Sequence, residues 1–445
     1  HSVENGQLDS AAQEGVDLYS TLDAELQKYG EKLMQNKRGC IVAIEPSTGE
    51  ILALVSAPTF DPNLLVGRAR GQNFAALAKD PLKPLFNRAT QAQYRPGSIF
   101  KLAQSLTALQ LGSITKETRI ACNRSIIGCH GPHSMDDLEM AIVHSCNPYF
   151  RGVLQRVVEA NRDPNNRAND AAMGLSIWNE QIRKLGFGSN LGSDLPGMKK
   201  GNVPSPEYYN KKYGVGGWNF STIYSIAIGE GELLINPVQM CNLACIIANK
   251  GFYVPPHTVK QIGRGGSART EYVTRVDVGV KPDYFETVVN AMEKVVGPGG
   301  TANSIKLSDI VICGKTGTVQ NPHGDDHSVF LAFAPMDKPK IAIAVFIENA
   351  KGGGGLWAAP TAGLMIEKYL RNKITRTDLE TRILSKSLQG QYAKLGGLSE
   401  TVKKEMRKQQ SQARKQRRLY EAYLKKFHPA QYKEWKAGVI ARGKK

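Results

Sequence analysis

Apolar runs near both ends of the chain predict β-strands. Residues 38–45 and 50–56 flank the turn Pro46-Ser47-Thr48-Gly49, a pattern typical of a β-hairpin. Near the other end, three apolar runs predict strands over residues 310–319, 329–334 and 341–348. Helical patterns occupy the chain between these two groups. We therefore expect an α+β fold in which one central antiparallel sheet, built from both chain ends, is flanked by helices and a helical subdomain.

Helical periodicity is clearest after Pro96-Gly97. These two residues rarely lie together inside a helix, so the run from Phe100 to Leu109 predicts a helix that begins at or near Ser98. A short strand followed by a helix is expected over residues 16–36. The other predicted helices cover residues 149–160, 169–186, 236–250, 283–296 and 357–370. Residues 113–148 and 186–222 lack periodicity and predict irregular loops.

Charge separates a basic tail from a nearly neutral body. Of the formal net charge of +18, about +15 lies between residue 371 and the end, from about 21 Lys and Arg against about 6 Asp and Glu. This tail is helix-prone, with Tyr420, Tyr423 and Phe427 among its basic residues. We interpret it as a solvated helical appendage. The alternative is attraction to anionic lipid, a glycan polymer or a partner protein.

Length and apolar content exclude two classes of protein. The 445 residues with 41% hydrophobic content suffice for a sizeable core in two or three domains, so a disordered chain is excluded. No run of about 18 apolar residues occurs, which argues against an integral membrane chain. The first residues are polar, without a signal peptide or an initiator Met, so we expect a processed or truncated chain.

Three short motifs in a fixed order carry the candidate chemistry: Ser98-Ile99-Phe100-Lys101, Ser145-Cys146-Asn147 and Lys315-Thr316-Gly317. Residues three apart share one face of a helix, so the Lys101 amine can reach the Ser98 hydroxyl. Acyl transfer requires a nucleophile, a base and a proton relay. We expect Ser98 to attack a carbonyl and Lys101 to act as base, its pKa lowered by burial and by Lys315. Ser145 would relay a proton, and Asn147 would hold a substrate amide and the Lys101 amine.

The third motif suits substrate binding, because it is expected on a strand edge. Lys315 and Thr316 would bind a substrate carboxylate, and Gly317 lets the substrate lie flat on the edge because it has no side chain. The backbone N–H groups of Ser98 and Thr318 would form the oxyanion hole. The candidate catalytic residues are thus Ser98, Lys101, Ser145, Asn147 and Lys315, and the candidate substrate-binding residues are Thr316, Gly317 and Thr318.

With these three motifs, the sequence resembles the transpeptidase domain of class B penicillin-binding proteins, in particular the elongation type numbered two. The resemblance covers about residues 15–370. It includes the stretches Ile44-Glu45-Pro46-Ser47-Thr48-Gly49, Tyr94-Arg95-Pro96-Gly97-Ser98, Ile228-Gly229-Glu230-Gly231 and Gly314-Lys315-Thr316-Gly317-Thr318. Two departures are Glu230, where Gln is common, and Arg95, where Pro is common. We expect neither to touch the chemistry.

The resemblance implies a peptidoglycan D,D-transpeptidase that cross-links D-Ala-D-Ala stem peptides during cell-wall elongation and is acylated and inhibited by β-lactams. It implies residues 16–372 as the transpeptidase domain, residues 1–15 as a remnant of an N-terminal pedestal, and residues 373–445 as the tail. It also implies the periplasmic face of the bacterial inner membrane, an anchoring N-terminal helix absent from this sequence, and a membrane glycosyltransferase as partner. Nucleic acid is not an expected partner, because the family works outside the cytoplasm.

A second constellation precedes and overlaps the second motif. Six soft or borderline metal ligands lie close together: Cys122, Cys129, His130, His133, His144 and Cys146. Four of them, Cys122, Cys129, His133 and Cys146, form our preferred set for a structural Zn²⁺, while catalysis requires no cofactor. Some elongation-type relatives are similar, with a zinc held by a His and a Cys about thirteen residues apart, as in His133 and Cys146. A Cys122–Cys129 disulfide and plain loop residues are the alternatives.

Other activities use the same motifs. A D,D-carboxypeptidase would pass the acyl group to water, and a serine β-lactamase would hydrolyse its acyl-enzyme quickly. We find no convincing Glu-bearing deacylation motif between the second and third motifs. A non-catalytic β-lactam-binding scaffold is the alternative from another class, and the three intact motifs argue against it.

Overall fold

The computed structural model describes residues 14–131, 133–266 and 270–393, together with Glu421, Ala422, Lys425 and Tyr432. Most of the basic tail and of the expected pedestal remnant therefore lies outside the described residues. The chain divides into two compact units, one of 1–321 with 325–389 and the other of 322–324 with 390–445. The central sheet and the candidate site both lie in the first unit.

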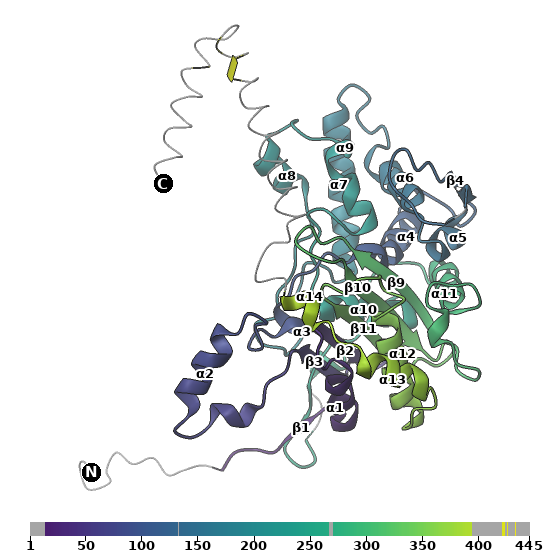
Figure 1. Ribbon diagram of the computed structural model, residues 1–445. Coiled ribbons are helices and arrows are strands. Elements are labelled where there is room, and N and C mark those ends of the chain that lie inside the picture. Colours follow the sequence, from purple (N-terminus) through teal and green to yellow (C-terminus); the bar gives the residue numbers. More distant parts are fainter. Residues whose placement is uncertain are drawn as a thin grey trace. The chain divides into compact units, whose positions relative to one another are not determined.

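A five-stranded antiparallel sheet forms the centre of this unit, with the strand order β3-β2-β11-β10-β9 (Figure 1). The strands are β2 (Gly39–Ile44), β3 (Ile51–Ala57), β9 (Cys313–Val319), β10 (His327–Ala334) and β11 (Ile341–Ile347). The N-terminal hairpin pairs with the C-terminal strands through β2 and β11, where Val42 lies opposite Ala344. The predicted α+β fold, with one sheet built from both chain ends, is confirmed.

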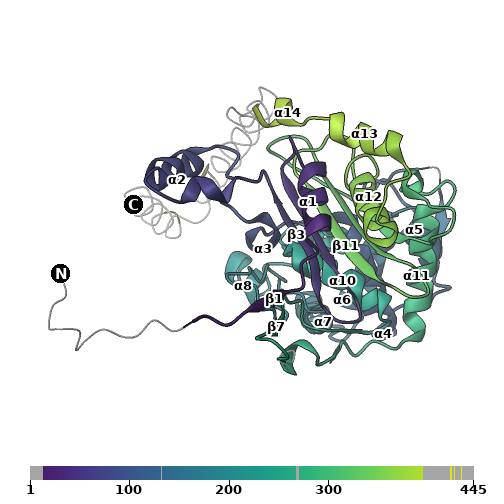
Figure 2. The same cartoon turned by 90° about the horizontal axis from the view of Figure 1, so that it is seen from below.

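Helices cover both faces of the sheet, so β2 and β11 are buried at every position. On one face, α10 packs on β2, β10 and β11. On the other face, α1 contacts β3 and α12, and α12 contacts β10 and β11. Figure 2 shows α1, α12 and α13 on the same side of the sheet. The helices of this paragraph are α1 (Ala24–Leu33), α10 (Pro237–Ala248), α12 (Ala358–Arg371) and α13 (Thr377–Ser385).

The remaining helices form the subdomain beside the sheet and the connections to it. They are α2 (Arg70–Lys79), α3 (Arg88–Gln91), α4 (Phe100–Gln110), α5 (Leu138–Val143), α6 (Asn147–Val158), α7 (Arg167–Lys184), α8 (Pro206–Tyr213), α9 (Phe220–Ile223) and α11 (Asp283–Val296). A further helix, α14 (Gln389–Ala393), belongs almost entirely to the second unit. Three two-stranded sheets join β1 (Leu18–Ser20) to β7 (Val259–Ile262), β4 (Ile120–Ala121) to β5 (Met135–Asp136), and β6 (Phe252–Tyr253) to β8 (Val276–Asp277). Over the described ranges, no helix combines the length and apolar character needed to cross a membrane.

Some elements differ from the sequence-based expectation. The expected loop of residues 186–222 contains α8 and α9, and the expected loop of residues 113–148 contains α5. Each begins at a capping side chain: Ser205 accepts from Tyr208 N, Asn219 from Ser221 N and Asp137 from Met140 N. These helices have eight residues or fewer, too short for apolar periodicity to reveal.

Candidate active site

Ser98 lies on a single 3₁₀ turn, Gly97–Ile99, which leads directly into α4. The turn is tightly seated. Gly97 has φ +57°, its N–H donates to Gly229 O at 2.9 Å, and a Cβ on it would lie 2.9 Å from Thr318 O. Only glycine meets both the backbone conformation and the close approach at this position. Ser98 is thereby held against β9, at the start of a helix as predicted.

Lys101 is completely buried on α4, one turn after Ser98. Its Nζ donates to Ser145 O at 2.6 Å, Ser145 Oγ at 3.1 Å and Asn147 Oδ1 at 2.6 Å. Burial lowers the pKa of Lys101 to about 7, because an ammonium loses hydration in the interior. The amine thus bonds to the second motif rather than to Ser98, where the sequence led us to expect it.

The second motif lies on a tight connection between α5 and α6. Ser145 has φ +55°, a left-handed conformation held by hydrogen bonds from Ser145 N to Ile142 O and from Cys146 N to Ala141 O. Such a backbone persists where its surroundings fix it, and it is frequent at functional sites. Asn147 begins α6 and donates its amide to Gly128 O at 2.7 Å.

The third motif lies on β9, the outermost strand of the sheet, whose only strand partner among the described residues is β10. Its other edge faces the Ser98 turn, since a Cβ on Gly317 would lie 3.3 Å from Ser98 N. Lys315 is completely buried and donates to Thr316 O at 2.9 Å. Burial, and then the charge of Lys101, lower the pKa of Lys315 well below its usual range. The expected repulsion between the two lysines therefore acts on Lys315.

A cavity of about 530 Å³ opens between the motifs. Six of the eight predicted catalytic and binding residues line it: Ser98, Ser145, Asn147, Thr316, Gly317 and Thr318. Lys101 and Lys315 are buried beside them. Motifs far apart in the sequence are thus brought to one cavity that exposes the hydroxyls and keeps both lysines from water.

Sequence reasoning missed several parts of the cavity wall. Thr301, which no motif singled out, contributes a hydroxyl 2.7 Å from Thr316 Oγ1. A glycine-rich loop, 352–355, lies directly on β9: a Cβ on Gly354 would lie 2.7 Å from Gly317 O. The four consecutive glycines were the available signal for such an approach.

Glu230, which we expected not to touch the chemistry, also lines the cavity. Its Oε1 accepts the Gln320 N–H at 3.1 Å, directly after β9. Its Oε2 lies 3.8 Å from Nη1 of Arg95, the other departure from the family pattern. The two departures are therefore an ion pair beside the Ser98 turn.

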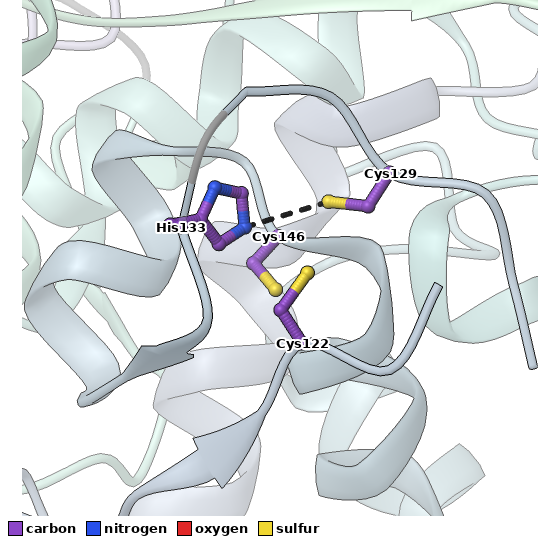
Figure 3. Close-up of side chains that lie close together, drawn as sticks. All are labelled: Cys122, Cys129, His133 and Cys146. Atoms are coloured by element: carbon purple, nitrogen blue, oxygen red, sulfur yellow. Dashed lines mark hydrogen bonds between the residues drawn. The ribbon is translucent and has the colours of Figure 1, made fainter. Parts of the chain in front are cut away.

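The four predicted zinc ligands lie together, as Figure 3 shows. The ligand atoms of Cys122, Cys129, His133 and Cys146 are all within 4.8 Å of one another. Three sulfurs and an imidazole nitrogen are a donor set typical of structural Zn²⁺, and tetrahedral bonding would place the sulfurs about 3.8 Å apart. The geometry therefore fits the ion after small shifts. All seven cysteines are free thiols.

The other two histidines of the constellation are not part of this set of four. His130 and His144 line the cavity, and His144 Nδ1 is 3.0 Å from Asp136 Oδ1. His133, Asp136 and His144 form a second cluster of possible ligand atoms, which shares His133 with the first. Asp136 is buried, and its Oδ2 has no hydrogen-bond partner. Because the two clusters share His133, a metal ion bound in one cluster would leave the other without this ligand.

Comparison with known proteins agrees with this geometry. The sequence model of one protein family, the penicillin-binding protein transpeptidase domain, matches residues 39–367 of this chain. Peptidoglycan D,D-transpeptidase MrdA of Acinetobacter baumannii is 32% identical over 368 residues, covering 76% of this chain and 52% of the relative. Peptidoglycan D,D-transpeptidase PbpA of Mycolicibacterium smegmatis is 30% identical over 381 residues, covering 80% of this chain and 73% of the relative. The chain thus spans about half the length of the MrdA relative.

Solved structures show the same architecture. Penicillin-binding protein 2 (PBP2) of Pseudomonas aeruginosa, in complex with WCK 5153, is 30% identical with a TM-score of 0.69, covering 81% of this chain and 77% of that chain. The ceftriaxone acyl-enzyme of penicillin-binding protein A from M. tuberculosis is 26% identical with a TM-score of 0.65, covering 81% of each chain. The protein therefore belongs to the penicillin-binding protein transpeptidase family, among its class B, PBP2-like members.

Proposed function

We propose that the protein is a peptidoglycan D,D-transpeptidase that cross-links stem peptides through a Ser98 acyl-enzyme during cell-wall elongation. One observation carries the proposal: the buried Lys101 amine is hydrogen-bonded to Ser145 and Asn147, one helical turn after Ser98. An amine with a pKa of about 7 is about half neutral at pH 7, so a large share of the protein has an amine that can accept a proton. The activity named for the MrdA and PbpA relatives supports the same assignment.

Acylation would begin when neutral Lys101 takes the hydroxyl proton of Ser98. Ser98 Oγ then bonds to the carbonyl carbon of the penultimate D-Ala, and the N–H groups of Ser98 and Thr318 stabilise the oxyanion. Collapse of this intermediate breaks the carbon–nitrogen bond. The proton passes from Lys101 to Ser145, whose Oγ is 3.1 Å from Lys101 Nζ, and on to the amine of the departing D-Ala. The acyl group then passes to the amine of a second stem peptide.

The terminal carboxylate of the donor suits the wall formed by β9. Thr316 and Thr301 place two hydroxyls 2.7 Å apart at this wall, and Thr318 adds a third. Lys315 is buried directly behind Thr316, to whose carbonyl it donates a hydrogen bond. A bound carboxylate would favour the charged form of Lys315, which burial otherwise disfavours.

Intact-mass measurement after incubation with benzylpenicillin tests the proposal. We expect the protein to gain the full mass of the antibiotic, and the S98A variant to gain nothing. Equal behaviour of the two proteins would instead support a non-catalytic scaffold. Rapid turnover of a chromogenic cephalosporin would indicate a β-lactamase. Transfer from a D-Ala-D-Ala donor to water alone, with an acceptor amine present, would indicate a D,D-carboxypeptidase.

We also propose that Cys122, Cys129, His133 and Cys146 hold a structural Zn²⁺. The ion would cross-link the loop after β4 to the start of α6 and take no part in acyl transfer. The arrangement of Cys146 between Ser145 and Asn147 supports this role, because a ligand there would fix both neighbours. Metal analysis of the purified protein, expected to give one zinc per chain, tests it.

The cellular setting is likewise a proposal. We place residues 16–372 in the transpeptidase domain at the periplasmic face of the inner membrane, with an anchor outside this sequence and a membrane glycosyltransferase as partner. A solved structure of PBP2 from Helicobacter pylori in complex with MreC, 26% identical with a TM-score of 0.65, supports a protein partner for this domain. Co-purification of the full-length protein with these membrane partners would test the setting.

A further inference from the structure

The cavity has two chemically different ends along β9. At one end, Thr316 and Thr301 present hydroxyls beside the buried Lys315. The Ser98 turn packs against the middle, at Gly317 and Thr318. The other end lies at Gln320, directly after the strand, where the wall changes from hydroxyls to carboxylates. Residues two apart on a strand are about 7 Å apart, so these positions are separate along the edge.

This polarity orients the donor peptide, an argument that rests on the proposed function. The terminal carboxylate takes the Thr316 end, and the reacting carbonyl lies at Ser98. The part of the donor on the acyl side of the scissile bond must then extend toward Gln320. An extended peptide advances about 3.5 Å per residue, so the first donor side chain before the penultimate D-Ala reaches this end.

Two carboxylates line the cavity there, those of Glu230 and Asp326. Glu230 is 8% exposed, and only its Oε1 accepts a hydrogen bond, from Gln320 N. Its Oε2 is 3.8 Å from Arg95 Nη1, beyond hydrogen-bonding distance, so it can still accept a donor. Asp326 is exposed, and its Oδ1 accepts from Asn321 N at 3.2 Å.

The charges nearby leave this end negative. Arg95 partly offsets Glu230, but it is not among the described residues that line the cavity, and Asp326 adds a second negative charge. The pKa of Glu230 is raised to about 7, mainly by burial and to a smaller extent by the charge of Asp326, against the opposing effects of the Gln320 N–H and Arg95. A cation arriving from the cavity would favour the ionised carboxylate and form a charge-assisted hydrogen bond.

The geometry points to a specificity subsite in which Glu230, assisted by Asp326, binds a cationic side chain on the acyl side of the donor peptide. Its ligand is a donor whose residue before D-Ala-D-Ala bears a side-chain ammonium. The subsite selects the donor and leaves the chemical step to Ser98 and Lys101.

Two matched donors test this subsite: Nα-acetyl-Lys-D-Ala-D-Ala, which has a free ammonium, and its Nε-acetylated counterpart, which has none. D-Ala release gives kcat/KM for each. We expect wild-type protein to prefer the cationic donor about tenfold, E230Q to lose most of this preference, and D326N to lose about half. E232Q is the matched control, because Glu232 lies on the same loop but pairs with Lys212 at 2.7 Å.

Benzylpenicillin separates this inference from the proposed function, because its side chain carries no cation. The control E232Q should be acylated by it at the wild-type rate, and labelling of E230Q at Ser98 shows that this variant is folded. Absence of labelling in the wild type would overturn the proposed function itself. An equal rate of wild type with both donors, or an unchanged preference in E230Q, would overturn the subsite alone. Loss of the wild-type preference in high salt provides a check that needs no variant.

Discussion

The two walls of the cavity are held in different ways. The wall that carries Lys101 and Lys315 consists of α4 and β9, where hydrogen-bond ladders and a continuous core keep both lysines completely buried. The opposite wall includes the loop 122–134, whose described residues, 122–131 with 133 and 134, are half-buried or exposed. The adjoining strands, β4 and β5, have two residues each. The first wall depends on apolar packing. The second depends on side-chain contacts among a few polar and sulfur-bearing residues.

The two walls are connected through one side chain of the second motif. Asn147 is shared between them, since its Oδ1 accepts from Lys101 and its Nδ2 donates to Gly128 O in the loop. A change in the loop can therefore reach the Lys101 amine through one side chain. We expect the packed wall to set the pKa values of the lysines, and the loop to set how accurately the second motif is placed.

The largest effect on the acylation rate is expected from replacing Lys101, the functional residue of the packed wall. K101M substitutes an uncharged side chain of similar length and so removes the base. The loss of a positioned general base costs about a thousandfold in rate. The second-order rate constant of acylation by a fluorescent penicillin measures it. K340M, which removes an exposed lysine at a distant turn, is the control. Acylation of K101M within tenfold of wild type would show that another group takes the proton.

Breaking the loop should have a smaller effect. C146S replaces a buried residue that we propose as a zinc ligand, between Ser145 and Asn147. We therefore expect loss of bound zinc and about a tenfold slower acylation, since the nucleophile and base remain. C245A, in the buried core at α10, should keep the metal and the wild-type rate. Metal content and acylation rate measured on the same samples decide the outcome. An unchanged zinc content in C146S would exclude it as a ligand.

The same comparison shows what the sequence could predict. The packed wall was predictable, because apolar runs define its strands and the Pro96-Gly97 pair marks the start of the Ser98 helix. The clustering of Cys122, Cys129, His133 and Cys146 was also expected from their density in the sequence, and their binding of a metal stays a prediction. The bond from Lys101 to Asn147 was expected, but its bonds to Ser145 were not, because the left-handed backbone at Ser145 directs this residue toward the amine and leaves no signature in composition or spacing. The place of Glu230 in the cavity wall was not predicted for the same reason, since only tertiary structure brings its loop beside Gln320.

A pH profile sharpens the comparison without a mutation. The pKa of Lys101 is lowered by burial to about 7, and the neutral amine is the reactive form. The acylation rate should therefore rise with pH, level off above about 7, and fall about tenfold per pH unit well below it. The rate of benzylpenicillin acylation between pH 5 and 9 measures this profile. A midpoint of the pH–rate profile near the ordinary pKa of lysine would mean that the Lys101 amine is exposed to water and not buried.

The smallest effect on acylation is expected away from both walls. Glu367 on α12 is completely buried and accepts from Arg376 Nε at 2.8 Å and from Thr375 N at 2.9 Å. R376A removes one partner of a buried carboxylate that Arg371 still contacts, so we expect a loss of about 2 kcal/mol in unfolding free energy. The acylation rate should stay within twofold of wild type, because α12 and α13 lie on the far side of the sheet from α10 and contribute nothing to the cavity lining among the described residues. Thermal melting of R376A tests the expected loss of stability, and penicillin labelling of the same sample tests the unchanged acylation rate. A slower acylation with unchanged stability would mean that the packed wall transmits strain from this helix to the lysines.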